Sequence, residues 1–224
     1  MKIIKDNCKR VRQRGFTMIE LMVSVTILTA VVGIVVNGLV KLQQRNSIET
    51  TKVDLTQESR EFMDQIVGDI HQSGFPSLKM FDPNSVPTPT LNSTYVSQGL
   101  VNVTPTSLQF EADVDGSGTV SEVFIQLKPI NGPCPCVVQR GTVSKLSYQG
   151  GTLPIYYTEV NNVNNTVIFL GYDNGGNPVA LAGAPSNNLA AIEITLNLRS
   201  PSPDSNGLFP TITMSTSAKI HNFN

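Results

Sequence analysis

The stretch Arg14-Gly15-Phe16-Thr17-Met18-Ile19-Glu20 opens the long apolar run that decides the fold of this chain. The run continues from Leu21 to Val40 without a charged residue, so Glu20 is the only charge within the hydrophobic block. A carboxylate inside an apolar segment is costly in lipid and therefore indicates a function. Residues 17–40 form about 24 positions, or roughly 36 Å of helix, which is long enough to cross a bilayer core of about 30 Å.

The residues that precede the apolar run are strongly basic. They comprise Lys2, Lys5, Lys9, Arg10, Arg12 and Arg14 against the single acid Asp6. This asymmetry favours an N-terminus that stays in the cytoplasm while the rest of the chain crosses. A cleaved secretory signal has a shorter core of about 7–15 residues and an A-x-A site, and no such site follows here. An ordinary signal anchor fits the length but leaves Gly15 and Glu20 unexplained.

Gly15-Phe16-Thr17-Met18-Ile19-Glu20, placed after a short basic leader, resembles the class III signal of type IV pilins and type II secretion pseudopilins. The resemblance implies that a prepilin peptidase cuts on the cytoplasmic side between Gly15 and Phe16 and then N-methylates Phe16. It also implies that Glu20 pairs with the N-terminal amine of a neighbouring subunit during filament assembly. Two charges that are each costly in hydrocarbon become tolerable when they are paired.

The same resemblance implies the partners, the location and the domain boundaries. The partners are the prepilin peptidase, other pilin or pseudopilin subunits and an inner-membrane assembly platform. The chain is expected in the bacterial inner membrane as a single pass with its N-terminus in the cytoplasm, and later in a periplasmic or surface filament. The expected parts are a cleaved leader (1–15), a transmembrane and assembly helix (16–40), an amphipathic helix (41–75) and a β-rich extracytoplasmic domain (76–224).

The pattern after the membrane segment predicts an α+β fold, in which a long N-terminal helix packs on a C-terminal antiparallel β-sheet. Apolar residues share one helical face at Leu42, Ile48, Leu55, Phe62, Ile66 and Ile70, and no proline interrupts residues 16–75. Ser73-Gly74-Phe75-Pro76 should end the helix. Expected strands are 107–112, 122–129, 136–140, 155–158, 166–172, 190–198 and 211–220, with alternation that makes 190–198 half-buried. Residues 173–178 read as a turn.

Several β-domain segments resemble the PilW-type minor pilins and the related GspJ-type minor pseudopilins. They are the segment from Gln109 to Gly118, the strand that ends near Val137-Val138-Gln139-Arg140, and Phe169-Leu170-Gly171-Tyr172-Asp173 with Gly176-Asn177-Pro178 after it. The resemblance implies a structural subunit that assembles or primes a type IV pilus. The alternative is a minor pseudopilin of a type II secretion or DNA-uptake system.

Two features of the β domain suggest further chemistry. Asp113, Asp115, Ser117, Thr119 and Ser121 follow the first nine positions of a calcium loop, but the twelfth position is Phe124 instead of Glu. A hairpin turn explains the same residues and is the preferred interpretation, so no cofactor is expected. Cys134 and Cys136 could form a local disulfide in an oxidising compartment, remain free thiols or bridge two chains.

The composition narrows the remaining function classes. The net charge is -1 and no basic aromatic patch is present, so nucleic-acid binding is not expected. The sequence has two histidines and no G-x-S-x-G, H-E-x-x-H or P-loop pattern, so we do not expect an enzyme. A membrane-anchored protein with a calcium-dependent binding domain is the remaining alternative from a different class.

Overall fold

The computed structural model describes residues 15–82, 89–130, 132–204 and 206–220. The chain divides into two compact units, Met1–Asn46 and Ser47–Asn224. The expected leader, with Cys8, lies outside the described residues except for Gly15. The first unit consists, where it is described, of an extended entry at residues 15–17 and the first part of one long helix.

Helix α1 (Met18–Gln72) is continuous over 55 residues. Among the described residues it is the one helix long and apolar enough to cross a membrane. Within the second unit it buries Leu55, Ser59, Phe62, Met63, Ile66, Asp69 and Ile70. The predicted apolar stripe is buried from Leu55 onward, whereas Leu42 at its start is 57% exposed. The helix ends at Gln72, and Gly74 follows with a φ of 81°, a conformation that glycine adopts without strain.

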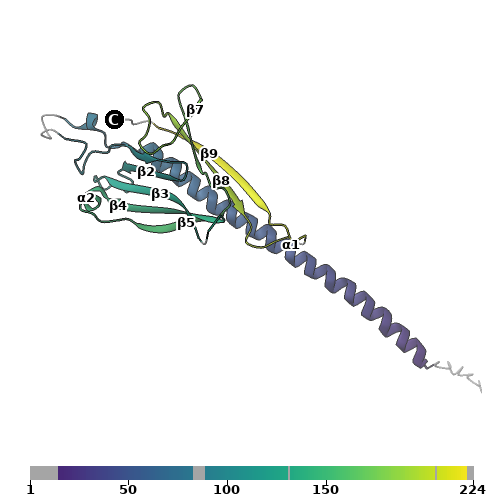
Figure 1. The fold of residues 1–224 in the computed structure, drawn as a ribbon. Coiled ribbons are helices and arrows are strands. Elements are labelled where there is room, and N and C mark those ends of the chain that lie inside the picture. Colours follow the sequence, from purple (N-terminus) through teal and green to yellow (C-terminus); the bar gives the residue numbers. More distant parts are fainter. Residues whose placement is uncertain (1–14, 83–88, 131, 205, 221–224) are drawn as a thin grey trace, which may run out of the picture. The chain divides into compact units, whose positions relative to one another are not determined.

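The described part of the second unit contains one nine-stranded sheet (Figure 1). The strands are β1 (Leu100–Val103), β2 (Ser107–Ala112), β3 (Ser121–Pro129), β4 (Cys136–Ser144), β5 (Ile155–Val163), β6 (Phe169–Tyr172), β7 (Pro178–Val179), β8 (Ala191–Arg199) and β9 (Thr211–Lys219). Their order is β1-β2-β3-β4-β5-β8-β6-β7, and β9 pairs with the other side of β8. All of the pairs are antiparallel. The predicted α+β fold is therefore confirmed.

All seven expected strands are present, with differences at their ends. The strand expected at 136–140 continues to Ser144, and the one expected at 155–158 continues to Val163. The strand expected from Thr166 begins only at Phe169. Two short strands, β1 and β7, and two short helices, η1 (Leu78–Met80) and α2 (Lys145–Gln149), were not expected from the sequence.

One face of the sheet and the second part of α1 form the hydrophobic core. The core joins Phe62, Ile66 and Ile70 of the helix to inward residues of the strands, such as Phe110 and Ile194. Strand β8 alternates between half-buried and buried along its whole length, as its sequence predicts. An ion pair joins this part of α1 to the sheet, in which the guanidinium of Arg140 binds the carboxylate of Asp69 at 2.9 Å. Burial raises the pKa of Asp69, although the neighbouring Arg140 opposes this rise.

Candidate functional site

The residues of the N-terminal signal form a capping box at the start of α1. The Thr17 amide and hydroxyl donate to Glu20 Oε2 at 3.2 and 3.1 Å. In return, the Glu20 amide donates to the Thr17 hydroxyl oxygen at 3.3 Å. This reciprocal arrangement satisfies backbone donors that have no partner within the helix. The structure therefore holds the Glu20 carboxylate at the beginning of the helix, directly after the Gly15-Phe16 bond.

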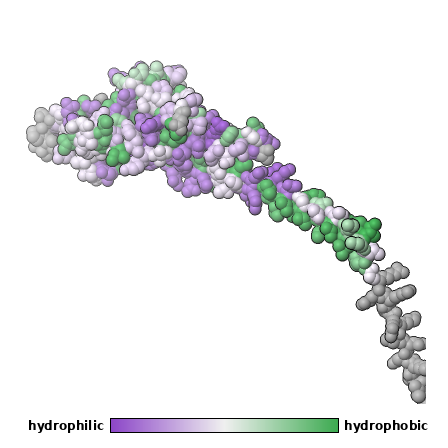
Figure 2. Space-filling model, turned by 60° about the horizontal axis from the view of Figure 1, so that its bottom comes forward, coloured by the Kyte–Doolittle hydropathy of each residue, from purple (hydrophilic) through white to green (hydrophobic). Residues whose placement is uncertain are grey.

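The apolar side chains that follow Glu20 have no partners in the described structure. The large hydrophobic residues between Met18 and Val40 are 47% to 83% exposed, and none of the most apolar window is buried. Figure 2 shows these residues as a green band along the helix. The hydroxyls of Ser24, Thr26 and Thr29 donate to carbonyl oxygens three or four residues earlier, at 2.7 to 2.8 Å. These three hydroxyls are thus satisfied within the helix, which suits a hydrocarbon environment.

The loop from Asp113 to Ser121 has the hydrogen bonds of a turn. Asp113 accepts the amide protons of Ser117 and Gly118 at 3.0 and 2.9 Å, and Asp115 also accepts the Ser117 amide at 3.1 Å. Ser121 is already the first residue of β3. Among the described residues, no group of three or more His, Cys, Asp and Glu side chains could hold a metal ion. The carboxylates of Asp113 and Asp115 thus accept backbone amide protons of their own loop.

Cys134 and Cys136 are joined in a disulfide, with their Cα atoms 4.5 Å apart. Cys136 is buried at the beginning of β4, where its Cα partner on β3 is Pro129. The bridge therefore closes the connection between β3 and β4 next to the core. Of the three arrangements that the sequence left open, the structure contains the local one.

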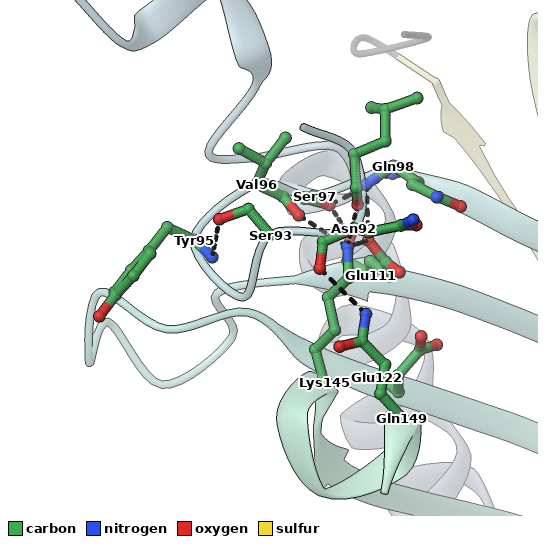
Figure 3. Close-up of polar contacts among 12 residues, drawn as sticks. Asn92, Ser93, Tyr95, Val96, Ser97, Gln98, Glu111, Glu122, Lys145 and Gln149 are labelled. Carbon is green, nitrogen blue, oxygen red and sulfur yellow. Dashed lines mark hydrogen bonds and ion pairs between the residues drawn. The ribbon is translucent and has the colours of Figure 1, made fainter. Parts of the chain in front are cut away.

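A buried cluster of charged side chains lies where β2, β3 and α2 meet (Figure 3). Lys145 Nζ forms an ion pair with Glu111 Oε2 at 2.7 Å. It also donates to the carbonyl oxygens of Leu91 and Val96 at 2.5 and 2.9 Å. Both charged side chains are almost fully buried, at 2% and 4% exposure. All three protons of the ammonium group thus have an acceptor, which buried charge requires.

Glu122 is the second carboxyl group of this cluster. It is the Cα partner of Glu111 across the β2–β3 pair, so both side chains lie on the same face of the sheet. Gln109 Nε2 donates to Glu122 Oε2 at 3.1 Å. Burial raises the pKa of Glu122 to about 7, and the negative charge of Glu111 adds to the rise, while the Gln109 hydrogen bond and Lys145 oppose it.

The sequence did not predict this cluster. Glu111 and Lys145 are 34 residues apart, and no motif connects them. The available signal was a glutamate within each of the two expected strands 107–112 and 122–129, namely Glu111 and Glu122. Thr17 was also missed as a partner of Glu20, although T-x-x-E before an apolar run is the sequence pattern of a capping box.

Comparison with known protein families agrees with the geometry of the N-terminus. Residues 10–36 match the family described as the prokaryotic N-terminal methylation motif. No curated protein and no solved structure gives a significant match to the chain. The matched segment contains Gly15, Phe16, the capping box and most of the exposed apolar helix. The N-terminal segment therefore carries the class III signal of type IV pilins and pseudopilins, and the helix that follows it is long and apolar enough to anchor the chain in a membrane. Such a signal implies processing by a prepilin peptidase and assembly with other pilin subunits.

Proposed function

We propose that this protein is a minor type IV pilin, a non-catalytic structural subunit that takes part in the assembly or priming of a pilus. The observation that carries the proposal is the Glu20 carboxylate at the start of an apolar helix whose side chains are exposed. An exposed apolar helix has to be covered by lipid or by other apolar helices. Before assembly, membrane lipid covers this helix. In a filament, the apolar helices of neighbouring subunits replace the lipid.

Processing prepares this end of the helix for assembly. Cleavage between Gly15 and Phe16 by the prepilin peptidase creates a cationic amine on Phe16, which is then N-methylated. The Glu20 carboxylate, oriented by Thr17, offers the opposite charge one helical turn away. Pairing it with the amine of a neighbouring subunit neutralises both charges in a surrounding where each alone is costly. The chain crosses the inner membrane once, and the second unit forms the extracytoplasmic head of the subunit.

The proposal is tested with the full-length chain in its native host. Glu20→Ala should be cleaved and methylated at Phe16, as read from the mass of the N-terminal peptide, but should be depleted from sheared filaments. Glu49→Ala is the matched control, because Glu49 lies on the same helix, is exposed and pairs with nearby Lys52 at 3.2 Å. Wild-type levels of Glu20→Ala in the filament fraction would contradict the assembly role.

The cell fraction in which the wild-type subunit is found distinguishes a pilus from a secretion or DNA-uptake system, since both use this signal. A minor pilin should be recovered with surface filaments after shearing. A minor pseudopilin of a type II secretion or DNA-uptake system should stay with the cell envelope, and its deletion should stop secretion or uptake.

A further inference from the structure

We propose that Glu111, Glu122 and Lys145 form a proton-controlled latch that holds the segment Leu91–Gln98 against the sheet and releases it as the pH rises. The segment has no regular secondary structure except turns, so it depends on partners outside itself. The proposal concerns the head alone and does not depend on the role of the N-terminal signal.

The cluster binds the segment at both of its ends (Figure 3). Lys145 Nζ donates to the carbonyl oxygens of Leu91 and Val96, and Glu111 Oε2 accepts the amide proton of Gln98 at 2.7 Å. The Ser97 hydroxyl donates to the backbone carbonyl of Glu111 through a short hydrogen bond. Four contacts of the segment thus end on two residues, and three of them depend on the position of the Lys145–Glu111 ion pair.

The charges of the cluster do not balance without a proton. Glu111 and Glu122 face each other across two neighbouring strands, and Lys145 supplies a single positive charge. With both carboxyl groups ionised, the buried cluster carries a net negative charge, which a low-dielectric surrounding disfavours. With one shared proton the cluster is neutral.

The other groups around Glu122 do not supply the missing charge. On β2 the neighbour is Gln109, which is neutral, and the Cα partner on β4 is Val143. On α2 the remaining titratable side chain is Tyr148, whose ring packs against Phe124 at a centroid distance of 5.3 Å. Arg140 lies on the opposite face of the sheet, where it binds Asp69 of α1. When Glu122 loses its proton, Lys145 is therefore the only positive charge in the cluster for two carboxylates.

Loss of the proton weakens the contacts that hold the segment. Glu122 as a carboxylate repels Glu111 and attracts the ammonium group away from the carbonyl oxygens of Leu91 and Val96. The raised pKa of Glu122, about 7, places this change close to neutral pH. Other hydrogen bonds of the segment lie outside the cluster and remain. The amides of Ser97 and Val120 donate to the carbonyls of Pro76 and Thr94, the Gly74 amide donates to the Ser97 hydroxyl, and Gln149 Nε2 donates to the Asn92 carbonyl. The expected response is a local loosening of an exposed surface that carries Tyr95, with the sheet unchanged.

Hydrogen exchange of the full-length protein in detergent micelles tests the latch. Peptides covering Leu91–Gln98 are followed from pH 5.5 to 8.5 and corrected for the intrinsic pH dependence of exchange, with a β8 peptide as internal reference. Protection of the segment should fall about tenfold or more as the pH rises from 5.5 to about 7 and then level off, because Glu122 has the higher pKa in the closed form and each unit of pKa shift corresponds to a tenfold change in an equilibrium. The β8 peptide should show no such step.

Glu122→Gln keeps the size and hydrogen bonding of the side chain but cannot lose a proton. This variant should keep the segment protected over the whole pH range. The matched control is Glu159→Gln on β5, which should retain the wild-type step. A carboxyl-carbon NMR titration of wild-type protein, labelled at glutamate, adds a readout that needs no variant and should show a group that titrates near neutral pH. Absence of that group, absence of the step in the wild type, or persistence of the step in Glu122→Gln would each overturn the proposal.

Discussion

Replacement of Lys145 by methionine is the sharpest test of how the head is held together. Methionine fills a similar volume but removes the ammonium group that binds Glu111 at 2.7 Å and donates to two backbone carbonyls. The Glu111 carboxylate is then buried without a counter-charge. Removal of one partner of a buried ion pair costs about 3–5 kcal/mol, which is a large share of the 5–15 kcal/mol that stabilises an ordinary domain.

A double variant separates the two causes of the free-energy loss in Lys145→Met, which are the unpaired charge and the lost hydrogen bonds. Lys145→Met with Glu111→Gln removes the uncompensated charge but still leaves the carbonyls of Leu91 and Val96 without their donor. We expect the double variant to lose less free energy of unfolding than Lys145→Met alone, by about 1–3 kcal/mol, the size expected for strongly coupled neighbours. Lys128→Met is the matched control, because Lys128 is exposed on β3 and its loss should change stability by about 0.5 kcal/mol or less.

Urea denaturation of the full-length protein in micelles, followed by the near-ultraviolet circular dichroism of its tyrosines, gives these free energies. The sequence has five tyrosines and no tryptophan, so the signal reports on the head. The reasoning is refuted if Lys145→Met unfolds within about 1 kcal/mol of the Lys128→Met control, or if the double variant is at least as unstable as the single one.

Two further perturbations test the electrostatics and the core. The pKa of Glu122 is higher in the folded state, about 7, than its ordinary value of 4.5, so this group lowers stability progressively as the pH rises from 4.5 to 7 and has no effect below 4.5. Glu122→Gln should therefore match the wild type in free energy of unfolding at acidic pH and exceed it at pH 8 by about 2 kcal/mol, after allowance for solvent screening. Ile66→Ala should lower the free energy of unfolding by about 2–5 kcal/mol, because Ile66 is 1% exposed in the core, whereas Val53→Ala on the exposed side of the same helix should have little effect.

The sequence predicts the elements that have a local pattern. Each of these patterns repeats with the period of a single helix or strand. They are the apolar run, the seven-residue spacing from Leu55 to Phe62 and the alternation of β8. The signal at Gly15 to Glu20 is equally local, so it could be recognised without the fold. Leu42 shows the limit of this reasoning, because it continues the apolar stripe but precedes the part of the helix that the sheet covers.

The features that the sequence did not predict depend on contacts between distant segments. Strand β1 is four residues long and exists because it pairs with β2, and the two residues of β7 exist because they pair with β6. β4 extends beyond Arg140 because Gly141 leaves room for the ring of Tyr156, which lies 3.1 Å from the position that a Cβ atom would occupy. Lys145 follows a strand and would usually be expected in solvent, so its burial could not be inferred from its neighbours.

The charged cluster is better explained by the backbone that it serves than by the stability that it adds. A buried ion pair can often be replaced by apolar residues without loss of stability, so Lys145 and Glu111 are not needed merely to fill the space. The segment Leu91–Gln98, however, presents carbonyl and amide groups to the sheet that no strand pairs. A lysine with three donors and a carboxylate with several acceptor sites satisfy these groups, which apolar side chains could not do. Because Glu122 brings a second carboxyl to a site with one ammonium, sensitivity to protons follows directly from that arrangement.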